Sequence, residues 1–228
     1  MNNFIKINNI NKKYEKNKTI KVLNDISFNF EAGKIYSIVG PSGSGKSTLL
    51  NLLSLIDTPS SGSIEISKNK ISFNNKIEND RIRAEKIGII YQDKNLLPDF
   101  SAIENVYLPN LLLSNDKDTS VNLAKKIIKN IGLSSRLNHF PSELSGGENQ
   151  RIAIARALIN DPEIILADEP TGSLDFENAK QIFKLLFNLK NKNRIIIFAT
   201  HNRYFANMAD CKIKMIGGKM KITNERFN

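Results

Sequence analysis

A glycine-rich segment at residues 40–48 carries the plainest chemical signal in the sequence. It reads GPSGSGKST and fits the phosphate-loop pattern G-x-x-x-x-G-K-[ST]. The glycines let backbone N–H groups turn toward phosphates, and the helix that follows adds partial positive charge. Lys46 can reach the β- and γ-phosphates, Ser47 can bind Mg²⁺, and Thr48 can support the α-phosphate. We expect the whole loop to bind the nucleotide: Gly40, Pro41, Ser42, Gly43, Ser44, Gly45, Lys46, Ser47 and Thr48.

Two carboxylates, Asp168 and Glu169, stand at the end of the apolar run EIILAD at 163–168. Ligands of parallel sheets bind at the carboxyl ends of the strands, so these side chains should lie near the phosphate loop. We expect Asp168 to hold a hydrated Mg²⁺ opposite Ser47 and Glu169 to polarise the attacking water. The alternative is a pair of carboxylates that only caps a strand. A nucleotide kinase would share the loop, but ADEP together with LSGG argues against one.

A second candidate anion site lies at residues 144–151, which read LSGGENQR. Ser145, Gly146 and Gly147 precede a helical run at 148–159. The backbone N–H groups and the dipole of that helix can therefore face an anion. The pattern alone leaves open why one short chain needs two helix starts suited to phosphate.

The segments that carry these motifs alternate between strand and helix patterns. Alternation of apolar and polar residues through Ile26, Phe28 and Phe30 is typical of a half-buried antiparallel strand. Apolar runs predict buried strands at 34–40, 86–92, 163–168 and 194–200. Two further segments, 62–66 and 70–73, also read as strands, and 216–220 reads as a closing hairpin turn. Helical spacing predicts helices at 46–56, within 93–160, and through Ala179, Ile182, Phe183 and Leu186. Strands covered on both faces and alternating with helices indicate a parallel α/β core with a helical insertion.

Length and composition restrict the class of protein. A chain of 228 residues makes one large domain, or one core with an inserted subdomain. The longest apolar runs are far shorter than the roughly 20 residues of a membrane span, and the N-terminal segment lacks the apolar stretch of a secretory signal. We therefore expect a cytosolic protein. The single cysteine, Cys211, excludes disulfide frameworks and cysteine zinc sites within a monomer, and it is a filler residue or a redox group.

The net charge of +10 allows two interpretations. It could favour nucleic acid or an anionic membrane surface. It could also reflect an AT-rich genome, since lysine outnumbers arginine 25 to 8 and asparagine and isoleucine are abundant. Arginine is the preferred residue for phosphate and base recognition, so the lysine excess favours the second interpretation.

The ordered set of motifs resembles the ATP-binding cassette (ABC) ATPases over essentially the whole chain. The set is the phosphate loop, Gln92 after IIY, LSGGE, LADEP, GSLD and ATHN. The resemblance implies an α/β P-loop NTPase with a RecA-like parallel-sheet core, an antiparallel β subdomain and an inserted α-helical subdomain. It implies one domain, 1–228, in which 1–92 and 161–228 form the nucleotide-binding core and 93–160 the helical signature subdomain.

The same resemblance implies roles for residues at matching positions. Tyr14 would stack on adenine, although it could also be a hydrophobic edge residue. Gln92 would sense Mg²⁺ and the γ-phosphate, and it starts the segment that touches a membrane subunit. His201 would contact the γ-phosphate, and Asp175 would couple two sites across a dimer. No chemistry is assigned to His139.

The resemblance also answers the question of two helix starts. Ser145, Gly146, Gly147 and Glu148 would bind the γ-phosphate of ATP held by a second copy, head to tail. ATP binding would then join the two copies and hydrolysis would let them part. The cofactors implied are ATP and Mg²⁺.

A narrower similarity extends through 90–112, 139–158 and 166–175 to the ATPases of bacterial lipoprotein-releasing systems. Macrolide-exporter ATPases of the MacB type and cell-division ATPases of the FtsE type share much of this sequence pattern. The similarity implies membrane subunits as partners, a place at the cytoplasmic face of the bacterial inner membrane, and no nucleic acid. A ribosome- or nucleic-acid-associated cassette and a division regulator remain the competing classes. Glu148 and Asn149 stand where many members of the family have Gln or Glu followed by a variable residue, and Asn202 in THN replaces a commoner Asp.

Overall fold

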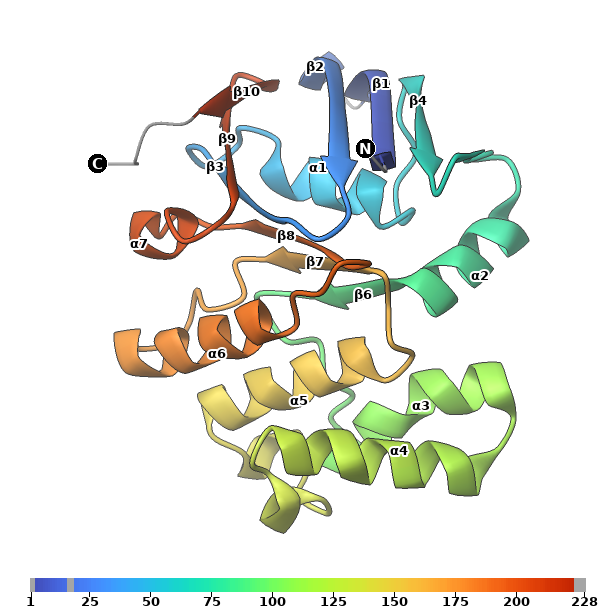
Figure 1. Ribbon diagram of the computed structural model, residues 1–228, viewed down its shortest axis with the longest axis vertical. Coiled ribbons are helices and arrows are strands. Elements are labelled where there is room, and N and C mark those ends of the chain that lie inside the picture. Colours follow the sequence, from blue (N-terminus) through green and yellow to red (C-terminus); the bar gives the residue numbers. More distant parts are fainter. Residues whose placement is uncertain (1–2, 16–18, 224–228) are drawn as a thin grey trace.

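A six-stranded sheet forms the centre of the molecule (Figure 1). The computed structural model describes residues 3–15 and 19–223. Within them the sheet has the order β10-β9-β3-β8-β7-β6, in which five strands are parallel and β10 runs antiparallel to β9. The strands are β3 (Ile35–Val39), β6 (Ile87–Ile90), β7 (Ile164–Asp168), β8 (Ile195–Ala199), β9 (Cys211–Ile216) and β10 (Lys219–Thr223).

The central strands are apolar throughout because both faces of the sheet are covered. In β7, Ile164 and Leu166 pack in one core cluster with the leucines of α1 (Lys46–Leu53). Ile165 and Ala167 point the other way, into a cluster with α6 (Phe176–Asn188) and Phe205 of α7 (Arg203–Ala206). Side chains alternate across a strand, so each central strand supplies both clusters. The parallel α/β core predicted from the apolar runs is confirmed.

A second, antiparallel sheet covers α1 on the side away from the central sheet (Figure 1). Its order is β2-β1-β4-β5, and its strands are β1 (Asn3–Glu15), β2 (Thr19–Glu31), β4 (Ser61–Ile66) and β5 (Asn69–Lys70). Ile26 and Phe30 are buried and Phe28 is half-buried, while the residues between them are exposed or half-buried. The alternation in the sequence therefore predicted this strand and its inward face correctly.

The helices that lie between β6 and β7 in the sequence form a third layer, at the lower end of Figure 1. They are α3 (Ala102–Ser114), α4 (Lys117–Asn130) and α5 (Gly146–Leu158), with two 3₁₀ turns at Ser134–Arg136 and Pro141–Glu143. A separate core cluster that includes Val106, Ala124, Ile128 and Ile152 holds them together. α5 contacts both β6 and α6, and it joins this group to the central sheet.

Two local features differ from the sequence expectation. Helix α2 (Lys76–Lys86) was not predicted because it has no apolar stripe: its only buried residue is Asn79, and Ile77 is 85% exposed. The helix begins with the Asn75 side chain accepting from the Glu78 N–H at 3.2 Å. The strand predicted at 70–73 is shorter, since only Asn69–Lys70 continues the ladder. No helix in the described ranges is long and apolar enough to cross a bilayer.

Candidate functional site

The predicted phosphate, metal and water residues come to one edge of the central sheet. The phosphate loop follows β3, Gln92 follows β6, Asp168 and Glu169 end β7, and His201 follows β8. Because these four strands are parallel, their carboxyl ends lie at the same edge. Residues that are far apart in the sequence therefore meet at one site.

The phosphate loop needs glycine at two places for steric reasons. A Cβ on Gly40 would lie 2.2 Å from the Met215 carbonyl oxygen of neighbouring β9. Gly45 has φ 101°, in the left-handed region, and precedes the first residue of α1. The loop thus packs closely against β9 and turns directly into α1, and both features depend on glycine.

Lys46 lies across this loop. Its Nζ donates to the carbonyl oxygens of Gly40, at 2.8 Å, and Pro41, at 3.1 Å. Ser44 is buried, and its Oγ has no hydrogen-bond partner within the described part of the chain. A buried hydroxyl without a partner costs free energy unless a ligand supplies one. The loop therefore presents a cation and an unused hydroxyl where a phosphate can bind.

Asp168 and Glu169 take different positions although they are adjacent. Asp168 pairs with Ala199 in the ladder between β7 and β8, and its Oδ1 is buried with no partner among the described residues. Glu169 adopts a left-handed backbone, φ 45°, and its N–H donates to the Ala199 carbonyl at 3.0 Å. Its Oε2 lies 2.9 Å from Nδ1 of His201. The turn after β7 thus brings a carboxylate and an imidazole together.

Gln92 is exposed and lies beside the segment that follows Glu169. A Cβ added to Gly172 would lie 3.1 Å from the Gln92 Nε2, which places the two residues in contact. Next to it, Lys94 Nζ donates to the Ser173 hydroxyl at 2.9 Å. The loop after β6 is therefore bonded to the loop after β7.

Arg156 of α5 holds the same loop from the other side, and the motif analysis missed it. Its guanidinium donates to the carbonyl oxygens of Lys94, at 2.8 Å, and Asn95, at 2.7 Å. Both of those residues have left-handed backbones, with φ of 60° and 46°. Burial lowers the pKa of Arg156 from its ordinary value. The sequence signal was a single arginine within the mainly apolar run IAIARALI, which gave no hint of its partners.

Tyr14, the residue expected to stack on adenine, lies beside α1 and is 39% exposed. Its hydroxyl donates to Asp57 Oδ2 at 2.7 Å. Burial raises the pKa of Tyr14, the hydrogen bond and the charge of Asp57 raise it further, and a hydrogen bond with Thr48 opposes them. Tyr14 is thus close to Thr48, which immediately follows Ser47 of the phosphate loop. The sequence gave no reason to connect Asp57 with this tyrosine.

The second helix start forms a capping box. Ser145 Oγ accepts from the Glu148 N–H at 3.2 Å, and Glu148 Oε2 accepts from the Ser145 N–H at 2.8 Å. The pKa of Glu148 is lowered to about 2. The largest cause is the hydrogen bond from the Ser145 N–H, and the next is the hydrogen bond from Arg136, which lies 2.9 Å away. Glu148 and the Ser145 N–H are therefore occupied within the chain. The groups at this helix start that can face an anion are the N–H groups of Gly146 and Gly147 and the Ser145 hydroxyl.

The two helix starts belong to opposite sides of the sheet. Figure 1 shows α1 above the central sheet and α5 below it. Gly147 packs against Asn178: a Cβ added to Gly147 would lie 3.1 Å from the Asn178 Oδ1. The Asn178 Nδ2 donates to Asp175 Oδ2 at 2.5 Å. Asp175 caps α6 and its pKa is lowered by the Asn178 hydrogen bonds. The LSGGE segment is thus packed beside Asp175 rather than beside the phosphate loop.

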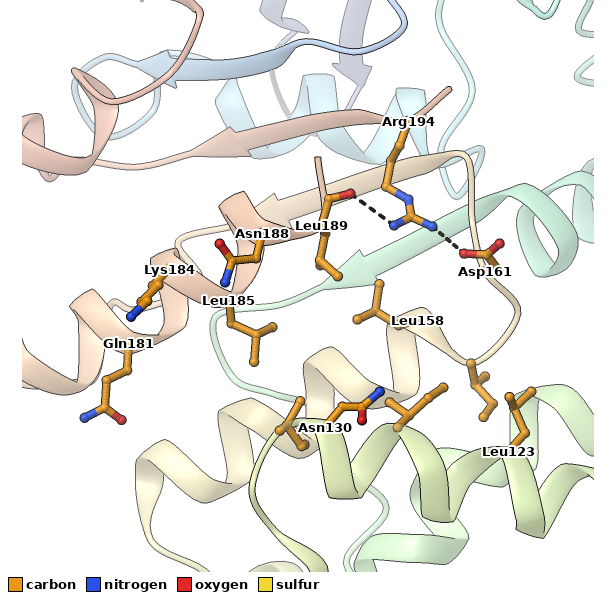
Figure 2. Close-up of a pocket in the computed structure, with 13 residues that line it drawn as sticks. Leu123, Asn130, Leu158, Asp161, Gln181, Lys184, Leu185, Asn188, Leu189 and Arg194 are labelled. Carbon is orange, nitrogen blue, oxygen red and sulfur yellow. Dashed lines mark hydrogen bonds and ion pairs between the residues drawn. The ribbon is translucent and has the colours of Figure 1, made fainter. Parts of the chain in front are cut away.

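A cavity of about 630 Å³ lies between α4, the end of α5 and α6 (Figure 2). Its walls are mainly leucine and isoleucine side chains, and the Arg194–Asp161 ion pair stands at one end. None of the motif residues lines it. The candidate nucleotide site lies at the carboxyl edge of the central sheet, away from this cavity.

The fold and site together define a phosphate-loop ATPase, and comparisons with known proteins give its family. The sequence pattern of the ABC transporter family matches residues 23–172. The chain is 41% identical over 224 residues to a Rickettsia bellii protein named lipoprotein-releasing system ATP-binding protein LolD, covering 97% of this chain and 99% of the relative. It is 44% identical over 201 residues to the protein of the same name from Cytophaga hutchinsonii, covering 88% and 92%.

A solved dimer of the ATP-binding cassette MJ0796, in a post-hydrolysis state with ADP and Pi, superimposes with a TM-score of 0.89. It is 35% identical and covers 97% of this chain and 99% of that one. The chain belongs to the ABC transporter family and is an ABC ATPase. The fold expected from the motif set, with its parallel core, antiparallel sheet and inserted helices, is confirmed.

Proposed function

We propose that this chain is the ATP-hydrolysing subunit of a transporter that releases lipoproteins from the inner membrane toward the outer membrane. The observation that carries the proposal is identity of 41–44%, over 88–97% of the chain, to relatives whose name states this system. The matches cover 92–100% of the relatives' own length, which supports an equivalent subunit rather than a shared module. The enzyme would be a translocase that couples ATP hydrolysis to movement in its membrane partners.

The roles proposed at the site follow from its chemistry. ATP would bind with its phosphates at the loop 40–48 and its adenine at Tyr14. Glu169 would accept a proton from the attacking water, and His201, 2.9 Å from it, would orient the carboxylate and contact the γ-phosphate. Gln92 would complete the site. Phosphoryl transfer needs positioning and charge neutralisation more than covalent help, and the Lys46 ammonium and loop amides supply these.

Mg²⁺ fits the donors at this edge. We propose Ser47, Gln92 and Asp168 as the residues that hold it. Support comes from the buried Asp168 Oδ1, which has no partner among the described residues. Mg²⁺ is commonly held by one or two carboxylates together with substrate phosphates, so a large cluster of acidic residues is not required. The ion would neutralise charge on the phosphates.

The active form would be a head-to-tail homodimer. Ser145, Gly146, Gly147 and Glu148 of one copy would face the γ-phosphate held by the other, with Glu148 acting by holding the capping box. Two solved structures of the MJ0796 cassette are dimers, which supports this arrangement. Residues 93–160 would serve as the helical signature subdomain of a single domain, and 1–92 with 161–228 as its core.

The chain would lie at the cytoplasmic face of the bacterial inner membrane, bound to integral subunits of the LolC and LolE kind. The segment after Gln92 offers a contact for such a partner, because Leu97 and Phe100 are 38% and 39% exposed. No nucleic acid is expected as a partner.

The test is reconstitution. The chain, co-purified with its membrane subunits and placed in vesicles that carry a labelled lipoprotein, should release the lipoprotein only with ATP. The Glu169→Gln variant in the same vesicles should not release it. Export of a soluble compound, or co-purification with a division protein alone, would replace lipoprotein release by the MacB-type or FtsE-type alternative.

A further inference from the structure

Two residues outside every recognised motif hold Tyr14 in place. The Tyr14 hydroxyl donates to Asp57 Oδ2 at 2.7 Å, and Asp57 Oδ1 accepts from Lys12 Nζ at 2.5 Å. Lys12 Nζ also donates to the Thr58 carbonyl at 2.7 Å and lies 4.7 Å from the centroid of the Tyr14 ring. Lys12 and Tyr14 are two residues apart on β1, and their contacts with each other and with Asp57 place both side chains on the same side of the strand.

Lys12, Tyr14 and Asp57 form a partly buried cluster whose hydrogen bonds restrict the Tyr14 ring. Lys12 is only 8% exposed, and lysine is rarely buried without partners. Burial by itself would raise the pKa of Asp57, but the hydrogen bonds from Lys12, Tyr14 and the Thr58 N–H outweigh it and lower that pKa. With both carboxylate oxygens occupied, the ring has a tether at its hydroxyl and a cation against one face.

The same cluster is tied to the phosphate loop by one helix. Asp57 follows α1, which begins at Lys46, and the Asp57 N–H donates back to the Asn51 carbonyl of that helix at 3.2 Å. An α-helix has a fixed rise per residue, so the phosphate loop and the anchor of the ring keep a set separation.

We propose that Lys12 and Asp57 are positioning residues that orient the Tyr14 ring for stacking on the base of the nucleotide. Lys12 lies over one face of the ring, and the base takes the other face. The inference rests on the proposed role of Tyr14 in ATP binding. It adds that affinity for the base depends on two residues that never touch the phosphates.

The experiment compares ligands with and without a base. ADP and inorganic pyrophosphate are titrated calorimetrically into the purified chain and its variants. Tyr14→Phe removes the hydroxyl, and with it the bonds to Asp57 and Thr48, and leaves the Lys12–Asp57 pair intact, so it tests the tether without breaking the buried pair. Asp57→Asn tests the pair itself. Asp25→Asn, an exposed carboxylate bonded to Asn9 on the same antiparallel sheet, is the matched control.

We expect Tyr14→Phe and Asp57→Asn each to weaken ADP binding by about threefold to tenfold, the range of an aromatic contact. Pyrophosphate binding should not change, and Asp25→Asn should behave as the parent. In a Tyr14→Ala background, Asp57→Asn should add no further loss.

Three results would overturn the proposal. If Tyr14→Ala weakens ADP binding but Tyr14→Phe and Asp57→Asn do not, the ring needs no tether. Equal losses for ADP and pyrophosphate would mean that Asp57 only supports the phosphate loop. If Tyr14→Ala binds ADP normally, the stacking role of Tyr14 itself fails, which is a separate result from failure of the tether.

Discussion

At the scale of single residues, the proposed chemistry depends on how Glu169 leaves its strand. β7 and β8 end side by side, and the Glu169 N–H still bonds to Ala199 of β8. The left-handed backbone then turns the chain, at a cost of about 1–2 kcal/mol for a residue with a Cβ. Such a conformation persists only where the surrounding structure fixes it, and here it places the carboxylate 2.9 Å from His201.

Replacement of Glu169 by glutamine tests the proposed base. Glutamine keeps the shape of the side chain but cannot accept the proton, so ATP turnover should fall about a hundredfold or more. ATP should still bind, because the phosphate loop is unchanged. Steady-state phosphate release and equilibrium nucleotide binding measure the two effects. The same substitution at Glu163, before the other end of β7, is the control and should leave both unaltered. Near-normal turnover in Glu169→Gln would mean that another group accepts the proton.

At the scale of elements, the helix ends and loop contacts link the catalytic edge to the inserted helices. Arg156 reaches from α5 to two backbone carbonyls in the loop that carries Gln92. That loop also bonds to Ser173, four residues after Glu169. Because a guanidinium offers paired donors in a fixed plane, it can hold both carbonyls at once, and an ammonium cannot match that geometry.

Arg156→Lys should therefore misplace Gln92 while the charge is kept. We expect kcat to fall about tenfold, the effect of losing one charged hydrogen bond, with little change in the KM for ATP. Steady-state kinetics separates the two constants. Arg81→Lys, on the exposed face of α2, is the control. A raised KM with normal kcat would show that Arg156 supports binding rather than the placement of the loop.

At the scale of the whole molecule, the sheet separates two groups that are both suited to one triphosphate. α1 and the LSGGE helix lie on opposite sides of it (Figure 1). One copy therefore offers a loop for the phosphates and, elsewhere, a second helix start for an anion. A second copy placed head to tail would bring the two together.

Ser145→Arg should block that pairing. A large cation at the helix start prevents close approach, so ATP-driven dimerisation should be lost in the slowly hydrolysing Glu169→Gln background. Light scattering with and without ATP measures the mass of the complex, and ADP titration should show unchanged binding at the phosphate loop. Ser142→Arg, three residues earlier and also exposed, is the control and should still dimerise. A stable ATP-dependent dimer of Ser145→Arg would refute a role for this segment in the interface.

The sequence by itself determined the motifs and the parallel core. Phosphate loops, strand-end carboxylates and two-sided apolar strands are local patterns whose physics needs only neighbouring residues. Helix α2 lacked such a pattern, since a cap and polar bonds stabilise it rather than an apolar face.

Only the tertiary structure decided which residues support the motifs. Lys12, Asp57 and Arg156 are ordinary charged residues in the sequence, and their partners lie 45, 43 and about sixty positions away. A hydrogen bond between distant segments depends on how elements pack, and packing is fixed by the sheet order and the cores. The proposed chemistry of the site was therefore readable from residue types, whereas the groups proposed to orient it were not.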